Sequence, residues 1–205
     1  MVSASWVQPT VTCPAPDARV SIWVGLSDKK TIEQVGTFVR CPTNALPKSP
    51  VKYTAWWEMY NPDHPMGAQP IAVAPGDTVT ATVFFANDKY TLAVIDQTTG
   101  KSFVVSEACA ATCHRDEAEW IVEAPASGSY PLANFSAVTF NQATALGANG
   151  STSIGGEPLD TYSIVHQDTT LATPDPVNAA GGLTSFVDRW LAGGPILVHH
   201  SSNGQ

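Results

Sequence analysis

The feature that most constrains the fold is a series of short segments in which apolar and polar residues alternate, each ended by turn residues. Arg19–Ser27 is the clearest, because Val20, Ile22, Val24 and Leu26 all fall on one side of an extended chain. A period of two belongs to β-strands, and hardly any helical period of 3.6 is visible along the chain. Many short strands separated by turns predict an antiparallel β-sandwich.

Further strands are predicted along most of the chain. They are Thr54–Tyr60, Thr78–Phe85, Tyr90–Asp96, Ser102–Val105, Ala118–Glu123, Phe135–Phe140, Thr161–His166 and Thr184–Trp190. The segment Asn141–Gly156 holds mostly small residues in no clear pattern, which predicts a long surface connection. Neither a repeat nor a linker is visible. We therefore expect one domain over residues 1–190 and a loosely held tail over residues 191–205.

Charge and hydropathy exclude several kinds of partner. The net charge is −8, and the ten Lys and Arg residues form no basic cluster, which argues against nucleic acid. No apolar run approaches the ~20 residues that span a bilayer, so no membrane segment is predicted. Only 14% of residues are charged. Few salt bridges can then be lost by protonation, and the fold is predicted to tolerate acid.

The four cysteines allow three pairings, among which the sequence alone does not choose. We favour Cys109–Cys113 as a tight local loop and Cys13–Cys41 as a bridge between two early connections. The alternatives are free thiols in a cytosolic protein, or a zinc site built on Cys109, Cys113 and His114. That zinc site lacks a fourth ligand, so we expect no metal. Oxidised cysteines predict a secreted protein, although no signal peptide is visible at the N-terminus.

Glu119 stands on a predicted strand rather than on a loop. Alternation places Glu119, Ile121 and Glu123 on one face, and Trp120 and Val122 on the other. A carboxylate on the open face of a rigid sheet contributes little to a core but is well placed as a general base. The first face is therefore a candidate catalytic surface.

A second strand carries an unusual combination of side chains on one face. Trp56, Glu58 and Tyr60 lie together, which is typical of a binding groove, although two aromatics covering a shallow patch would look the same. Gln34 by itself reads as an ordinary exposed strand residue. Glu33 then falls on the core side, which suggests a β-bulge or a partly open edge there.

Four motifs in this order resemble the glutamic peptidases, or eqolisins, and two shorter matches support them. The motifs are Trp23-Val24-Gly25, Gln34-Val35-Gly36, Trp56-Trp57-Glu58-Met59-Tyr60 and Ala118-Glu119-Trp120-Ile121-Val122-Glu123. The supporting matches are Pro75-Gly76-Asp77 and the strand that ends Val138-Thr139-Phe140. The resemblance extends from about Val2 to Trp190, which is nearly the whole chain.

The resemblance implies a concanavalin A-like, lectin-like jelly roll of two large antiparallel sheets. It implies a secreted, monomeric endopeptidase that acts in acid on protein or peptide substrates without a cofactor. Glu119 would activate a water molecule, and Gln34 would hold that water and stabilise the oxyanion. Trp23, Trp56, Glu58 and Tyr60 match positions that line the substrate cleft.

This chain departs from the family pattern at three places. Ser27-Asp28 stands where the family usually has Asp-Gly, and Thr37-Phe38 replaces a segment that often holds an acidic residue. The family's first strand has no counterpart before Val2, so we expect an unfilled sheet edge beside the site. Either the tail segment Leu197–Asn203 fills this edge, or the tail is disordered.

A non-catalytic sandwich that binds carbohydrate or peptide is the alternative function. It would use the aromatic face of Trp56 and Tyr60, and sandwiches of this architecture serve many purposes. Glu119 and Gln34 distinguish the two hypotheses, because a binding module has no need of both on one face.

Overall fold

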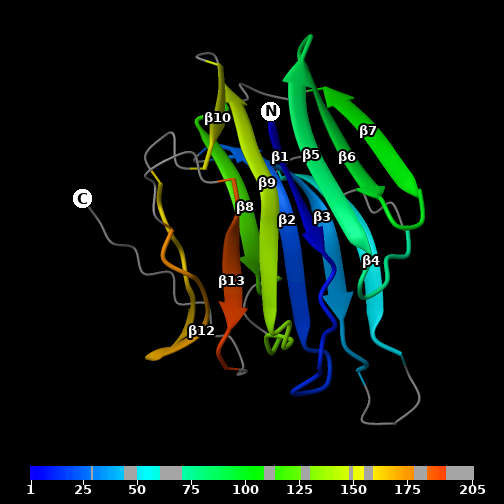
Figure 1. The fold of residues 1–205 in the computed structure, drawn as a ribbon, viewed down its shortest axis with the longest axis vertical. Helices are drawn as coiled ribbons and strands as arrows, with labels where there is room; N and C mark the ends of the chain where they lie inside the picture. Colours follow the sequence, from blue (N-terminus) through cyan, green and yellow to red (C-terminus); the bar gives the residue numbers. More distant parts are fainter. Residues whose placement is uncertain are drawn as a thin grey trace.

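The computed structural model describes residues 1–28, 30–43, 50–60, 71–108, 114–125, 130–147, 150–154, 159–177 and 184–192. Within these ranges the chain forms thirteen strands and no helix. They make two antiparallel sheets that pack face to face (Figure 1). The all-β sandwich predicted from the sequence is confirmed. None of the described segments is a helix that could cross a membrane.

The larger sheet contains nine of the described strands. They are β1 (Val2–Val7), β5 (Thr78–Ala86), β6 (Lys89–Asp96), β7 (Ser102–Ala108), β9 (Ala137–Gly147), β10 (Gly150–Ser153), β11 (Ile164–His166), β12 (Thr169–Pro174) and β13 (Phe186–Trp190). Their order is β11-β12-β13-β9-β1-β5-β6-β7, and β10 pairs with β9. Asn87 and Asp88 join β5 to β6 with φ angles of 52° and 60°, which the tight two-residue hairpin requires.

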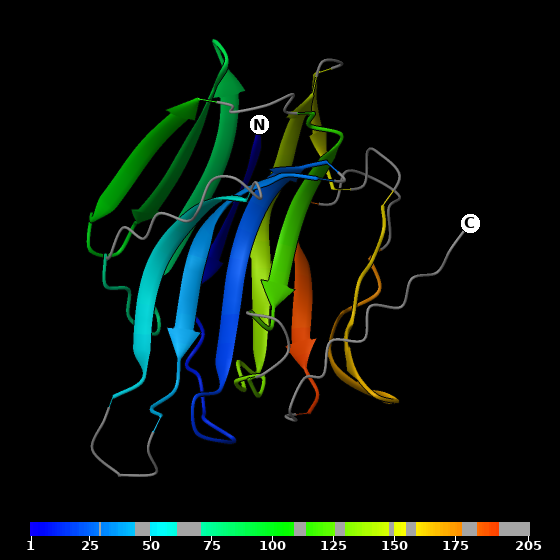
Figure 2. The ribbon, with the colours of Figure 1, turned by 180° about the vertical axis from the view of Figure 1, so that it is seen from behind.

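The smaller sheet has four described strands and carries the predicted functional residues. They are β2 (Arg19–Ser27), β3 (Ile32–Arg40), β4 (Lys52–Tyr60) and β8 (Glu117–Glu123). Their order is β4-β3-β2-β8, with β4 in cyan at one edge and β8 in green at the other (Figure 2). The outer edge of β8 pairs with no other described strand.

The core lies between the two sheets and is built by the alternation seen in the sequence. Val20, Ile22 and Val24 of β2 are fully buried and face the larger sheet. Trp6 packs edge-on against Phe140 with 5.7 Å between ring centroids. Each large apolar side chain buried this way stabilises the fold by about 1.5–3 kcal/mol. The opposite face of the smaller sheet points away from this core.

The interval Asn141–Gly156 is not the long surface connection that the sequence suggested. β9 continues to Gly147, and β10 pairs back onto it from Gly150 to Ser153. Its small Ala, Thr and Ser side chains give no apolar alternation to detect, yet the backbone pairs in the sheet. β1 and β12 were not among the predicted strands, although Val2, Ala4 and Trp6 of β1 alternate with Ser3 and Ser5.

The predicted disulfide between Cys13 and Cys41 is confirmed, with the two Cα atoms 5.8 Å apart. It joins the segment before β2 to the end of β3. Cys109 and Cys113 lie outside the described residues, as does the tail from residue 193 onward, so those two predictions stay predictions.

Candidate active site

Four residues form one row across the smaller sheet. Glu58 on β4 pairs with Gln34 on β3, which pairs with Gly25 on β2, which pairs with Glu119 on β8. Residues paired across antiparallel strands lie on the same face of a sheet. The parity predicted from the sequence therefore places Glu119 and Gln34 on one surface.

Gly25 adds no side chain at the centre of this row. A Cβ atom at this position would lie 2.9 Å from the Trp23 ring, so a larger residue would disturb that ring. Gln34 and Glu119 stand two strands apart, about 10 Å between their Cα atoms at the usual strand spacing. The residue between them has no side chain of its own, and the Trp23 ring lies against it.

Glu119 is half-buried and uses only one of its two carboxylate oxygens. The Ser27 hydroxyl donates a hydrogen bond of 2.8 Å to Oε1, whereas Oε2 is buried and has no partner among the described residues. Burial raises the pKa of Glu119, and the Ser27 hydrogen bond opposes that rise. A buried polar atom without a partner is unusual in a folded protein, which marks Glu119 as a candidate functional group.

Gln34 is held by its other row neighbour. Its Nε2 donates a hydrogen bond of 2.7 Å to Glu58 Oε2, and its buried Oε1 has no partner among the described residues. Burial raises the pKa of Glu58, as does the nearby Glu123, while the bond from Gln34 lowers it. The Gln34 amide is therefore fixed in orientation and keeps one N–H and one oxygen unused.

The next row supplies the aromatic part of the surface. It runs from Trp56 through Gly36 and Trp23 to Ile121. A Cβ at Gly36 would lie 2.1 Å from the Ile22 carbonyl oxygen, so only glycine lets these strands approach so closely. Trp23 Nε1 donates to Glu123 Oε2 at 3.0 Å, which fixes its ring beside Gly25. Trp56 is buried here, whereas Tyr60 at the end of β4 is 52% exposed.

All six predicted site residues thus share one face of the smaller sheet. Glu123 and Ser27 also lie on that face, although the sequence indicated no role for Glu123 and marked Ser27 only as a departure from the family pattern. The strand parity of both residues was the available signal. Their contacts with Trp23 and Glu119 depend on the pairing of β2 with β8, which the sequence does not specify.

Glu33 does not mark a bulge or an open edge, as the sequence had suggested. The pairing of β3 is regular on both sides, with Glu33 opposite Leu26 and Met59. Its side chain is 2% exposed and points into the core. Burial raises the pKa of Glu33 to about 7, and the neighbouring Tyr90 and Thr31 oppose the rise only in part. A neutral carboxyl group tolerates such a place far better than a charged one.

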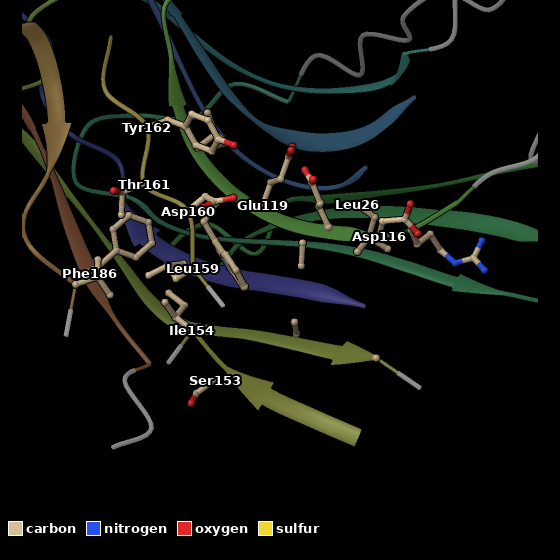
Figure 3. A pocket seen from close by; sticks show the side chains of 18 of the residues that line it. Leu26, Asp116, Glu119, Ser153, Ile154, Leu159, Asp160, Thr161, Tyr162 and Phe186 are labelled. Atoms are coloured by element: carbon tan, nitrogen blue, oxygen red, sulfur yellow. The ribbon is translucent and has the colours of Figure 1, made fainter. Parts of the chain in front are cut away.

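A large cavity of about 1150 Å³ runs beside β8. Figure 3 shows Glu119 at this cavity together with Leu159, Asp160, Tyr162 and Phe186. Among the described residues, no three His, Cys, Asp or Glu side chains are grouped so as to hold a metal ion.

Comparison with known proteins gives consistent results. The chain matches the sequence profile of the Peptidase A4 family over residues 1–183. Its fold resembles aspergilloglutamic peptidase from Aspergillus niger, with a TM-score of 0.66 and 24% identity over 85% of this chain and 100% of that one. It also resembles scytalido-glutamic peptidase with a transition state analog inhibitor, with a TM-score of 0.72 and 19% identity over 93% of this chain and 91% of that one.

A third similar structure is SCP-B, a member of the Eqolisin family of peptidases, in a complex with the tripeptide Ala-Ile-His. Its TM-score is 0.68, at 20% identity over 93% of this chain and 91% of that one. Identities this low show a shared fold. No curated protein sequence matches the chain.

Proposed function

The chain belongs to the Peptidase A4 family and is thus a peptide hydrolase, and we propose that it is an acid-acting glutamic endopeptidase. Glu119 is the general base, and Gln34 stabilises the oxyanion. The observation that carries this proposal is the row in which both residues flank Gly25, each with an unpartnered buried oxygen. A water molecule between Glu119 Oε2 and Gln34 Oε1 would satisfy both atoms.

Hydrolysis then proceeds in two steps. Glu119 Oε2 takes a proton from the water as its oxygen bonds to the peptide carbonyl carbon, which gives a tetrahedral intermediate. The N–H of Gln34 that does not bind Glu58 donates to the negatively charged oxygen. Glu119 next gives its proton to the amide nitrogen, and the C–N bond breaks to leave a carboxyl group and an amine.

The carboxyl groups around the row support an acidic working range. Burial is the largest cause that raises the pKa values of Glu58, Glu119 and Glu123. Glu123 also raises the pKa of Glu58 and of Glu119 by charge repulsion, so the three do not ionise together easily. Mild acid therefore leaves some of them neutral while Glu119 still exchanges a proton with the reacting groups.

The surroundings support a peptide substrate in an extracellular setting. Trp23, Trp56, Glu58 and Tyr60 form the cleft that receives the polypeptide, with aromatic faces for apolar side chains. The Cys13–Cys41 disulfide forms in oxidising compartments, which supports secretion. The enzyme acts as a monomer, needs no cofactor, and has neither nucleic acid nor membrane as its partner.

Digestion of an unfolded protein substrate tests the proposal most directly. We expect cleavage at acid pH that survives both a chelator and pepstatin, with internal fragments visible by mass spectrometry. Loss of cleavage with the chelator would assign the chemistry to a metal. Inhibition by pepstatin would point to a pair of aspartates instead.

Tyr60 offers a test of the cleft that leaves the chemistry intact. Tyr60→Ala removes an exposed aromatic surface at the end of β4. We expect KM for a peptide substrate to rise about 3- to 10-fold, with kcat within twofold, because an aromatic contact contributes about 1 kcal/mol. Val104→Ala, an exposed apolar residue on β7, is the control and should change neither constant. An unchanged KM in Tyr60→Ala would remove Tyr60 from the cleft.

A further inference from the structure

Ser27, the last residue of β2, has a buried hydroxyl in direct contact with Glu119. Only 1% of its surface is exposed, and its Oγ donates to Glu119 Oε1 at 2.8 Å. Ser27 pairs with Ile32 on one side and Glu117 on the other, so it lies in the row next to that of Gly25 and Glu119. A hydrogen bond to a charged acceptor is about twice as strong as one between neutral groups.

The backbone around Ser27 is fixed from both sides. The Asp28 carboxylate accepts hydrogen bonds from the amides of Lys30 and Thr31, at 2.6 and 2.7 Å, and so closes the turn after β2. The Ser27 carbonyl oxygen accepts the Asp116 amide at 2.9 Å, which ties the start of β8 to the same point. The hydroxyl is therefore held in place before any substrate arrives.

Ionisable groups surround Glu119 from several elements. Glu117 and Glu123 lie on its own strand, Glu58 on β4, and Asp116, Asp160, Tyr162 and Asp188 around the cavity, where His114 and Arg115 also lie. The β2 and β3 positions in its row are Gly25 and Gln34, neither of which ionises. Glu117 and Glu123 act with burial to raise the pKa of Glu119, and the Ser27 hydrogen bond lowers it.

We infer that Ser27 is a positioning residue for Glu119. Its hydroxyl occupies Oε1, so that Oε2 is the oxygen left for water over Gly25, and it favours the carboxylate anion. This inference rests on the proposed function, because it assigns Ser27 an effect on the base of that reaction. The hydroxyl touches neither substrate nor water and acts through Glu119 alone.

Ser27→Ala removes the donor and leaves the strand intact. A base must be ionised to work, so activity falls as pH drops through the pKa of Glu119. Without the hydrogen bond that pKa rises, and the acid limb of kcat/KM should move up by about one pH unit, the size expected for one hydrogen bond to a charged group. At the acid end kcat should fall about tenfold, with KM within twofold. Ser27→Thr keeps a hydroxyl and should restore the limb.

Ser21→Ala is the matched control. Ser21 is a buried serine on the same strand and face, paired with Glu123 rather than beside Glu119. The acid limb of kcat/KM in Ser21→Ala should match that of the wild type. A Ser27→Ala enzyme whose rate falls equally at every pH would overturn the inference, as would a folded Ser27→Thr enzyme with the limb of the alanine variant.

Direct titration of the Glu119 carboxyl by carbon NMR gives a readout that needs no activity. The pKa of Glu119 measured in this way should be higher in Ser27→Ala than in the wild type. An unchanged pKa would overturn the inference. Glu119→Gln is measured in parallel. If that variant stays active, the proposed function itself fails. If it is inactive while the limb and titration of Ser27→Ala match the wild type, only the role of Ser27 fails.

Discussion

Glu119→Gln is expected to lower kcat for peptide hydrolysis by about 10⁴-fold, the upper range for loss of a general base. The amide has almost the shape of the carboxylate and keeps an oxygen that can accept from Ser27, so the fold should survive. It cannot take up a proton from water. We expect no cleavage in an acid-pH peptide assay, with a melting temperature close to that of the wild type.

Gln34→Ala should act on the other side of Gly25 from Glu119. Removal of one oxyanion donor costs about 10²–10³ in kcat, so a small residual rate should remain. Glu107→Gln on β7 is the control, because it makes the same change as Glu119→Gln on an exposed side chain of the larger sheet. Full activity in either row variant would place the chemistry elsewhere in the molecule.

The second large effect concerns stability, which should fall as pH rises from about 4.5 to 7. Two carboxyl groups are buried, Glu33 in the core and Asp188 beside the cavity. Burial raises the pKa of each to about 7. In the unfolded chain both ionise near pH 4. Between these values the folded state binds more protons than the unfolded state, so stability decreases with increasing pH and levels off above pH 7.

Ionisation of each of these two groups lowers the free energy of unfolding by about 3 kcal/mol across that window, since one pKa unit corresponds to about 1.4 kcal/mol. For a chain of this size we expect the melting temperature to drop by roughly 10–20 °C between pH 4.5 and 7.5. The effect of Asp17 on stability changes with pH in the opposite direction. Hydrogen bonds from Arg40 and Arg19 lower its pKa to about 2, so its contribution is present above pH 4 and is lost only in stronger acid.

Calorimetry from pH 3 to pH 8 measures this profile. Glu33→Gln keeps the shape of the buried side chain and removes the titration, so its profile should be visibly flatter above pH 4.5. Glu107→Gln should follow the wild type. A melting temperature that rises toward neutral pH would contradict the assignment of neutral, buried carboxyl groups.

The strand pattern was predictable where both faces differ strongly in polarity. β2 was predicted residue for residue, because the aliphatic residues Val20, Ile22, Val24 and Leu26 recur at every second position. β9 beyond Phe140 was missed, because Ala, Thr and Asn make its two faces alike. Glu33 falls on the core side of its strand, which suggested a β-bulge or an open edge. The structure instead buries its carboxyl group, which is possible because the raised pKa favours the neutral form.

The residues of the candidate site could be predicted from the sequence, but their arrangement across the sheet could not. Strand parity placed Glu119, Glu123, Trp56 and Glu58 on suitable faces. That Gly25 stands between Gln34 and Glu119 follows from the order β3-β2-β8 and from the turn at Asp28, which sets the register. Local sequence patterns do not encode long-range strand order, so neither the central place of Gly25 nor the Ser27 contact could be derived from the sequence.

The position of β1 sets when this protein can finish folding. Val2 pairs with Val83 on one side and with Ala145 on the other, so the middle of the larger sheet joins the start of the chain to segments made much later. During synthesis the edge of β1 that pairs with β9 stays open until residue 147 has emerged, well after β5 is available to the other edge. Such distant pairings make folding slow and expose an apolar strand to wrong partners in the interval. A chaperone that covers this strand early would therefore raise the yield of folded enzyme.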